Sequence, residues 1–170
     1  MKRILVIALV SYMAFALEFL LYNFWDPWGR WLKPELLILV VIFFNLYLGI
    51  RFSIIAAFFC GLFKDTLGIA PFGTHIVVYL AASYLTTFVR RYIYQPGSRF
   101  SRIVVVFFVV LGCFIVQIIL SNMNHELRLG GMLSFILLPQ LVTTILAATY
   151  VFARLKDISI FFDLKAKHAS

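Results

Sequence analysis

Apolar runs long enough to cross a lipid bilayer dominate this sequence and restrict what it can fold into. A transmembrane helix needs about 20 apolar residues, and the segment 4–24 has this length with few polar side chains. Hydrophobic residues make up 64% of the 170-residue chain and charged residues only 13%, too little polar surface to coat a soluble globule. We therefore predict an all-α polytopic membrane protein with six transmembrane helices, at about residues 4–24, 35–50, 52–70, 74–89, 103–121 and 132–153.

Lysine and arginine residues fall mostly on one side of the membrane in this arrangement. Six spans place both termini on the same side, and the loops between them alternate. Only Arg30, Lys33, Lys64 and Arg128 fall on the opposite side, which leaves 11 of the 15 Lys and Arg residues on the side of the termini. Because cytoplasmic loops carry the excess of positive charge, we expect both termini to be cytoplasmic.

The first apolar run has a second interpretation, a cleaved signal peptide. Met1-Lys2-Arg3 is charged, and Ala14-Phe15-Ala16 loosely fits a cleavage site. However, the sequence stays apolar for several residues past this point except at Glu18, and losing the run would spoil the charge distribution. We therefore expect one transmembrane domain at residues 1–153, followed by a basic cytoplasmic tail at residues 154–170 whose apolar residues suit a membrane surface.

The net charge of +8 fits two kinds of protein, one that binds nucleic acid and one that has basic cytoplasmic loops beside a membrane. No basic cluster is interleaved with exposed aromatic residues, so we expect no nucleic-acid binding. Cys60 and Cys113 both lie within apolar runs, which excludes a disulfide framework and a thiol-rich metal site. We interpret His75 as a hydrogen-bonded residue at a helix start, since no second metal ligand stands at a suitable spacing. We expect no cofactor and no metal.

Small residues in the third run form one narrow helical face. Ala57, Gly61, Asp65 and Gly68 are spaced by four, four and three residues, so a helix brings them to the same side. Small residues let membrane helices approach closely. We expect this face to meet another helix rather than lipid, and the chain to turn near Gly73 before the fourth run.

Two carboxylates, Glu18 and Asp65, lie inside apolar runs at a shared depth of roughly 20 Å from the start of their spans. A carboxylate at that depth costs a few kcal/mol unless it is paired, which makes it a candidate functional residue. Three roles are open: pairing with Lys64, Arg30, Lys33 or a helix N-terminus, contact with a partner protein, and proton or ligand handling.

Polar residues at helical spacing give several runs one less apolar face. Such faces pack transmembrane helices together, and the alternative is that they line a ligand cavity. The positions are His75, Tyr79 and Ser83 with Thr86 or Thr87, Cys113 with Gln117 and Ser121, Asn45 with Gly49, and Gln140 with Thr144.

Motifs for catalysis are missing from the sequence. It holds no nucleophile with a base and an orienting residue, no phosphate-binding glycine loop and no HExxH motif. We therefore expect a protein that is not an enzyme.

The stretch from Leu32 to Leu85 resembles the bacterial rod shape-determining protein MreD family. The family pattern is close to Gly-Leu-x-x-Asp followed by a glycine about eight residues on, which here is Gly61, Leu62, Asp65 and Gly73. Lys33-Pro34-Glu35, which opens the second apolar run, also agrees with the family. The remaining runs agree in hydropathy.

The resemblance implies a non-enzymatic scaffold of the cell-elongation machinery in the bacterial inner membrane. The implied partners are MreC, the RodA glycosyltransferase with its class B penicillin-binding protein, membrane lipids and, indirectly, the cytoskeletal MreB. The implied fold is similar to the S component of energy-coupling-factor transporters. The residues implied in partner binding or helix packing are Pro34, Glu35, Ala57, Gly61, Leu62, Asp65, Gly68 and Gly73.

The implied fold leaves one serious alternative, the substrate-binding S component of a vitamin transporter. Such a subunit needs a cavity with several convergent polar groups, and the sequence offers few on the outer side. A third possibility is an ion channel that uses Glu18 and Asp65, but polar residues are lacking in the inner half of the membrane.

Overall fold

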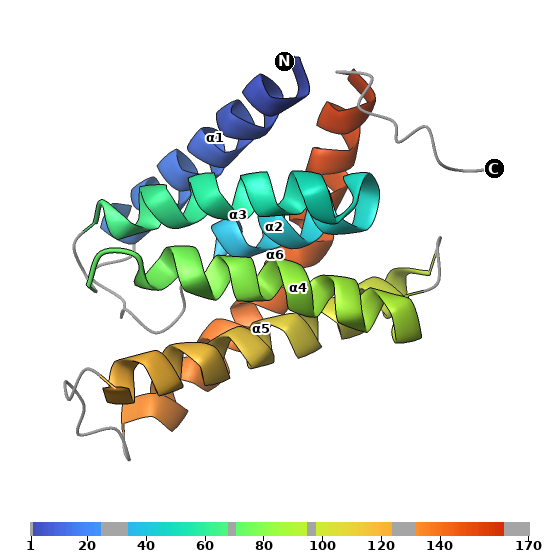
Figure 1. Cartoon of the computed structure of the whole chain (residues 1–170). Coiled ribbons are helices and arrows are strands. Elements are labelled where there is room, and N and C mark those ends of the chain that lie inside the picture. Colours follow the sequence, from blue (N-terminus) through green and yellow to red (C-terminus); the bar gives the residue numbers. More distant parts are fainter. Residues whose placement is uncertain (1, 25–33, 68–70, 95–97, 124–131, 162–170) are drawn as a thin grey trace.

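The computed structural model describes residues 2–24, 34–67, 71–94, 98–123 and 132–161. These parts of the chain form six helices and no strands (Figure 1), which confirms the predicted all-α fold. The helices are α1 Lys2–Phe24, α2 Leu36–Leu48, α3 Ile50–Asp65, α4 Thr74–Ile93, α5 Arg99–Met123 and α6 Met132–Phe161. Gly68, the tryptophan-rich segment 25–33 and residues 162–170 lie outside the described residues.

Helix boundaries differ from the apolar runs most at the ends of α3 and α6. Helix α3 ends at Asp65, whereas the third run continues to about residue 70. Helix α6 continues to Phe161, so the first part of the expected tail 154–170 is helical. Hydropathy marks where a segment suits lipid, whereas a helix ends where its terminal backbone groups find other partners.

Helix α2 is the central helix of the bundle. It contacts all five other helices, and every residue from Leu36 to Leu46 is buried. Its sequence accounts for this position, because LLILVVIFFNLYL holds one strongly polar residue, Asn45, and is apolar on all sides. A helix of that kind is stable only where other helices or lipid surround it completely.

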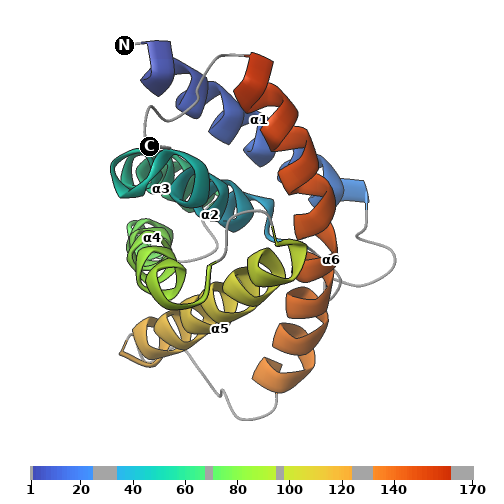
Figure 2. The same cartoon turned by 90° about the vertical axis from the view of Figure 1, so that its right-hand side faces the viewer.

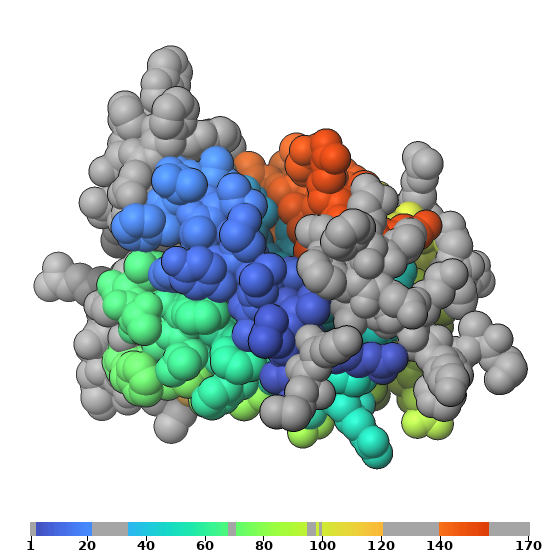
Figure 3. Space-filling view, turned by 90° about the horizontal axis from the view of Figure 1, so that it is seen from above, coloured from blue at the N-terminus to red at the C-terminus, as the bar shows by residue number. Residues whose placement is uncertain are grey.

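The other five helices pack around α2. Figure 1 shows α3, α4 and α5 side by side in that order, with α1 above α3 and with α2 and α6 behind. Figure 2 shows that α6 runs steeply across the bundle, where it packs against α2 and α5. Figure 3 shows α1 lying across the upper face, between the α3–α4 side and α6.

Two helices, α1 and α5, are long and apolar enough to cross a membrane by length and composition, among the residues that the structure describes. Only 22% of Arg3–Leu21 and 33% of Phe100–Leu120 is buried inside the bundle. A core helix of a soluble protein would be mostly buried, whereas these two helices expose large apolar side chains such as Leu5, Leu20 and Ile119. An apolar exterior of this extent is typical of a surface that lies in lipid.

Polar side chains of α2 and α4 connect these helices inside the bundle. Asn45 Nδ2 donates to the Ser83 carbonyl at 2.8 Å and to Thr87 Oγ1 at 2.9 Å. Arg90 Nη1 donates to the Asn45 carbonyl at 2.8 Å, near the C-terminal end of α2. The predicted polar faces of these two runs therefore pack against each other.

Gly61 allows α3 and α4 to approach closely. A Cβ atom at this position would lie 2.5 Å from the Ile76 Cα atom and 2.8 Å from the Ile76 backbone nitrogen. Gly112 on α5 is also crowded, but the nearest atom to a Cβ there would be Leu85 Cδ1, at 2.7 Å. The Gly61 contact is with backbone, which cannot rotate away as a leucine methyl group can.

These two glycines provide a matched pair of substitutions. Gly61→Ala should destabilise the protein by about 1–3 kcal/mol, because α3 and α4 must separate, and Gly61→Leu should do so more strongly. Gly112→Ala should change stability by less than about 1 kcal/mol, since Leu85 can change rotamer and alanine favours the helix. The unfolding of the purified variants in mild detergent measures these changes in stability. Equal stability of the two alanine variants would contradict the close approach at Ile76.

Candidate functional site

A lysine between two glutamates joins three helices at the start of α2. Lys64 of α3 forms an ion pair with Glu18 Oε1 of α1. The Lys64 Nζ atom also lies 3.8 Å from Glu35 Oε1, at the residue that precedes α2. The side chains of Lys64, Glu18 and Glu35 are only 13%, 16% and 14% exposed. We call these three residues the lysine cluster.

Helix α6 joins the lysine cluster through an amide and a hydroxyl group. Gln140 Nε2 donates to Glu35 Oε1 at 3.0 Å. The Glu35 backbone N–H donates to Thr144 Oγ1 at 3.2 Å, and that hydroxyl donates to the Gln140 carbonyl at 2.7 Å. The cluster therefore connects α1, α2, α3 and α6.

The start of α2 requires polar groups at this place. The first N–H groups of a helix have no acceptor within the helix, and those of α2 lie inside an apolar bundle. Glu18 Oε2 accepts from the Leu37 N–H at 3.2 Å, and Thr144 Oγ1 accepts from the Glu35 N–H. The positive end of the helix dipole favours the two carboxylates, and Lys64 neutralises one of their charges.

Asp65 performs a similar role at the start of α4. Its Oδ2 atom accepts from the Gly73 N–H at 2.9 Å, and its Oδ1 atom accepts from the His75 N–H at 3.1 Å. The His75 ring nitrogen Nδ1 lies 2.8 Å from the same Oδ1 atom, where it donates when it carries the hydrogen. The Asp65 side chain is completely buried. The carboxylate therefore caps α4 from the last residue of α3, and we call this contact the α4 cap.

The Gly-Leu-x-x-Asp motif and its later glycine together build this α3–α4 turn. Gly61 faces the Ile76 backbone, one turn before Asp65 on the same side of α3. Gly73 has a φ of +96°, a left-handed conformation that glycine adopts readily. This conformation positions the Gly73 and His75 N–H groups for the carboxylate. Leu62 contributes its carbonyl to the Thr66 N–H at 3.2 Å, at the end of α3.

The structure separates Glu18 and Asp65, the two carboxylates within the predicted apolar runs, into different sites. Glu18 belongs to the lysine cluster and Asp65 to the α4 cap, and their hydrogen-bond partners within the described residues are different. Both have the first of the three roles considered: Glu18 pairs with Lys64 and with the start of α2, and Asp65 pairs with the start of α4. The interpretation of His75 as a hydrogen-bonded helix-start residue is confirmed. A role of either carboxylate in partner binding stays a prediction.

The other predicted site residues lie around these two sites. Ala57 and Gly61 are buried on the face of α3 that carries Asp65, and Pro34 is half-buried beside Glu35. The link from Glu35 to Gln140, which lie 105 residues apart, was not predicted from the sequence. The sequence signal for this contact was Gln140, an amide within the sixth apolar run that lies one helical turn before Thr144.

In both sites, buried charged side chains pair with groups of the same chain. Among the described residues, no group of three or more His, Cys, Asp and Glu side chains could hold a metal ion. Cys60 and Cys113 are buried and free. The carboxylate oxygens of Glu18, Glu35 and Asp65 accept hydrogen bonds from this chain itself.

Removal of the lysine should test the lysine cluster. Lys64→Met leaves Glu18 and Glu35 without their shared cation and should destabilise the protein by about 3–5 kcal/mol, as breaking a buried ion pair does. A triple variant that also carries Glu18→Gln and Glu35→Gln should recover most of this loss. The measurement is the free energy of unfolding of each purified variant in detergent. Wild-type stability of Lys64→Met would show that the cluster does not hold the helices together.

Substitution of Asp65 should loosen the start of α4. Asp65→Ala leaves two buried N–H groups without their acceptor and should cost about 1–2 kcal/mol, as loss of a helix cap does. Asp65→Asn retains one acceptor oxygen and should cost less. Hydrogen exchange of the amides of Gly73 and His75 should accelerate in the order wild type, Asn, Ala. The same exchange rates in all three proteins would exclude the cap.

A known protein family matches most of this chain. The family model of the rod shape-determining protein MreD matches residues 1–155. No curated protein and no solved structure matches the chain, so the expected similarity to S components stays a prediction. The match covers all helices except the last residues of α6. The chain therefore belongs to the MreD family of rod shape-determining proteins, a membrane-associated structural family.

Proposed function

We propose that this protein is a non-enzymatic, multi-pass scaffold of the bacterial inner membrane that serves cell elongation and peptidoglycan synthesis. The family match over residues 1–155 carries the proposal, because it connects the chain to rod shape determination. In this role the protein positions other proteins, and it performs no chemistry on a substrate.

The distribution of polar groups supports a structural role. The lysine cluster and the α4 cap engage Glu18, Glu35, Lys64 and Asp65 within the chain. Large apolar side chains cover much of the described exterior instead. A bundle of this kind is held together by its internal polar contacts and presents apolar helix faces to lipid and to other transmembrane helices.

The arrangement of basic residues supports a cytoplasmic location for one end of the bundle. Figure 1 shows the start of α3, the end of α4 and the start of α5 at the same end of the bundle. These segments carry Arg51, Arg90, Arg91 and Arg102. The carboxylate of Asp65 lies at the other end of α4, about 30 Å away for a 20-residue helix. By the positive-inside rule, we expect the basic end to face the cytoplasm.

The partners that we propose are MreC, RodA with its class B penicillin-binding protein and, indirectly, MreB. Asp65 lies buried beneath the α3–α4 turn, so its contribution to partner binding is the position of that turn rather than a direct contact. Pro34 and Glu35 fix the start of α2 in the same way. Loss of either site should therefore alter the surfaces that partners meet.

Affinity purification from native membranes tests the scaffold. Wild-type protein in mild detergent should recover MreC and the wall-synthesis proteins, with no small molecule bound in stoichiometric amount. Asp65→Ala should reduce partner recovery more than it reduces membrane insertion, while Gly112→Ala serves as the control and should leave both unchanged. Mass spectrometry and quantitative immunoblots provide the measurements.

Three outcomes would contradict these expectations. Recovery of an ATPase module or of a tightly held vitamin would overturn the scaffold in favour of a transporter subunit. Full partner recovery by Asp65→Ala, in cells that remain rod-shaped, would exclude a role of this aspartate in assembly.

A further inference from the structure

A groove with two cations at its rim lies between α5 and α6. The cavity has a volume of about 440 Å³. Its walls include the buried apolar side chains of Val106, Ala148 and Phe152, which are 0%, 2% and 3% exposed. Arg102 of α5 and Lys156 of α6 also line it. The groove therefore combines an apolar interior with positive charge.

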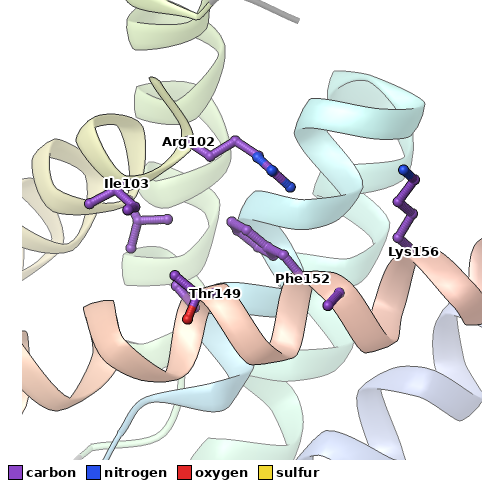
Figure 4. A pocket seen from close by; sticks show the side chains of 8 residues that line it. Arg102, Ile103, Thr149, Phe152 and Lys156 are labelled. Carbon is purple, nitrogen blue, oxygen red and sulfur yellow. The ribbon is translucent and has the colours of Figure 1, made fainter. Parts of the chain in front are cut away.

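The two cations lie at the same end of the groove. Helix α5 runs away from the basic end of the bundle and α6 runs back toward it, so Arg102 and Lys156 both mark that end. Figure 4 shows both cationic groups on one side of the Phe152 ring, with Thr149 and Ile103 beyond it. Ala148 is eight residues before Lys156, so the apolar wall extends about 12 Å from the lysine position along the helix axis.

Neither Arg102 nor Lys156 forms an ion pair within the described part of the chain. Other arginines at this end have partners: Arg90 binds the Asn45 carbonyl, and Arg154 binds Tyr150. The carboxylates of the lysine cluster and of the α4 cap are engaged within those two sites. Within the described residues, the charge at the groove rim is therefore left for an external anion.

We propose that this groove binds one anionic phospholipid of the cytoplasmic leaflet. The phosphate of the headgroup would lie between Arg102 and Lys156, and an acyl chain would lie along Val106, Ala148 and Phe152. Basic pockets between transmembrane helices recognise anionic headgroups in this way. A soluble phosphate compound would leave the apolar wall unused. The assignment to the cytoplasmic leaflet rests on the proposed orientation of the basic end, whereas the proposed protein partners take no part in the site.

Lipid binding to the full-length protein tests this site. Native mass spectrometry would compare phosphatidylglycerol with phosphatidylcholine of the same acyl chains. Wild-type protein should retain one phosphatidylglycerol about 30-fold more tightly, as two cations near a membrane surface imply. The double variant Arg102→Gln/Lys156→Gln should lose this preference. Arg51→Gln/Arg91→Gln removes the same charge from exposed positions at the same end and should keep it.

Two controls distinguish a lipid site from a general attraction of anions to the basic end. Thr149→Trp should weaken binding of both lipids, because it fills the groove from an exposed position without a change in charge. Inorganic phosphate at millimolar concentration should not compete. Equal retention of the two lipids by wild type, equal loss in both double variants, or competition by phosphate would each overturn the proposal.

A photoreactive residue at position 149 would identify the occupant in native membranes. The expected product is an adduct with a phospholipid. An adduct with a protein segment instead would show that the groove is a protein interface and would overturn the lipid assignment. Partner recovery is measured separately, so a negative result here leaves the scaffold proposal intact.

Discussion

The rest of the bundle depends on the two ion pairs that Lys64 forms, one with Glu18 and one with Glu35. Helix α2 is apolar on all sides and begins among other helices, where water cannot satisfy its first N–H groups. Carboxylates can satisfy them, but two buried carboxylates need a cation nearby. Lys64 supplies it from α3, and this requirement fixes the relative positions of α1, α2 and α3. Gln140 and Thr144 then add α6 to the same point.

The Gly-Leu-x-x-Asp motif meets requirements within the chain itself. Gly61 permits the close approach of α4, Asp65 caps that helix, and Gly73 provides the left-handed turn between them. Each residue type meets a separate physical requirement, and the three requirements apply to one turn. A family motif of this kind therefore reports how two helices are joined.

The sequence predicted the number and type of the helices because hydropathy depends on local composition. It predicted the end of α3 too late, because hydropathy does not record that α3 ends at Asp65, whose carboxylate binds the N–H groups of Gly73 and His75. The pairing of Glu18 with Lys64 was one of the alternatives considered. The contact of Gln140 with Glu35 was not predictable, since no local pattern records which residues meet across 105 positions.

The internal pairing of charges limits how such a protein can recognise others within a membrane. Apolar side chains gain little from leaving lipid for another apolar surface, so helix association there depends on shape and on close packing. Figure 1 shows α1 and α5 on opposite sides of the bundle, and both expose apolar faces. Recognition of partners by these faces would be steric, whereas charge recognition would be confined to the basic end. The groove of Arg102 and Lys156 lies at that end and combines positive charge with an apolar wall.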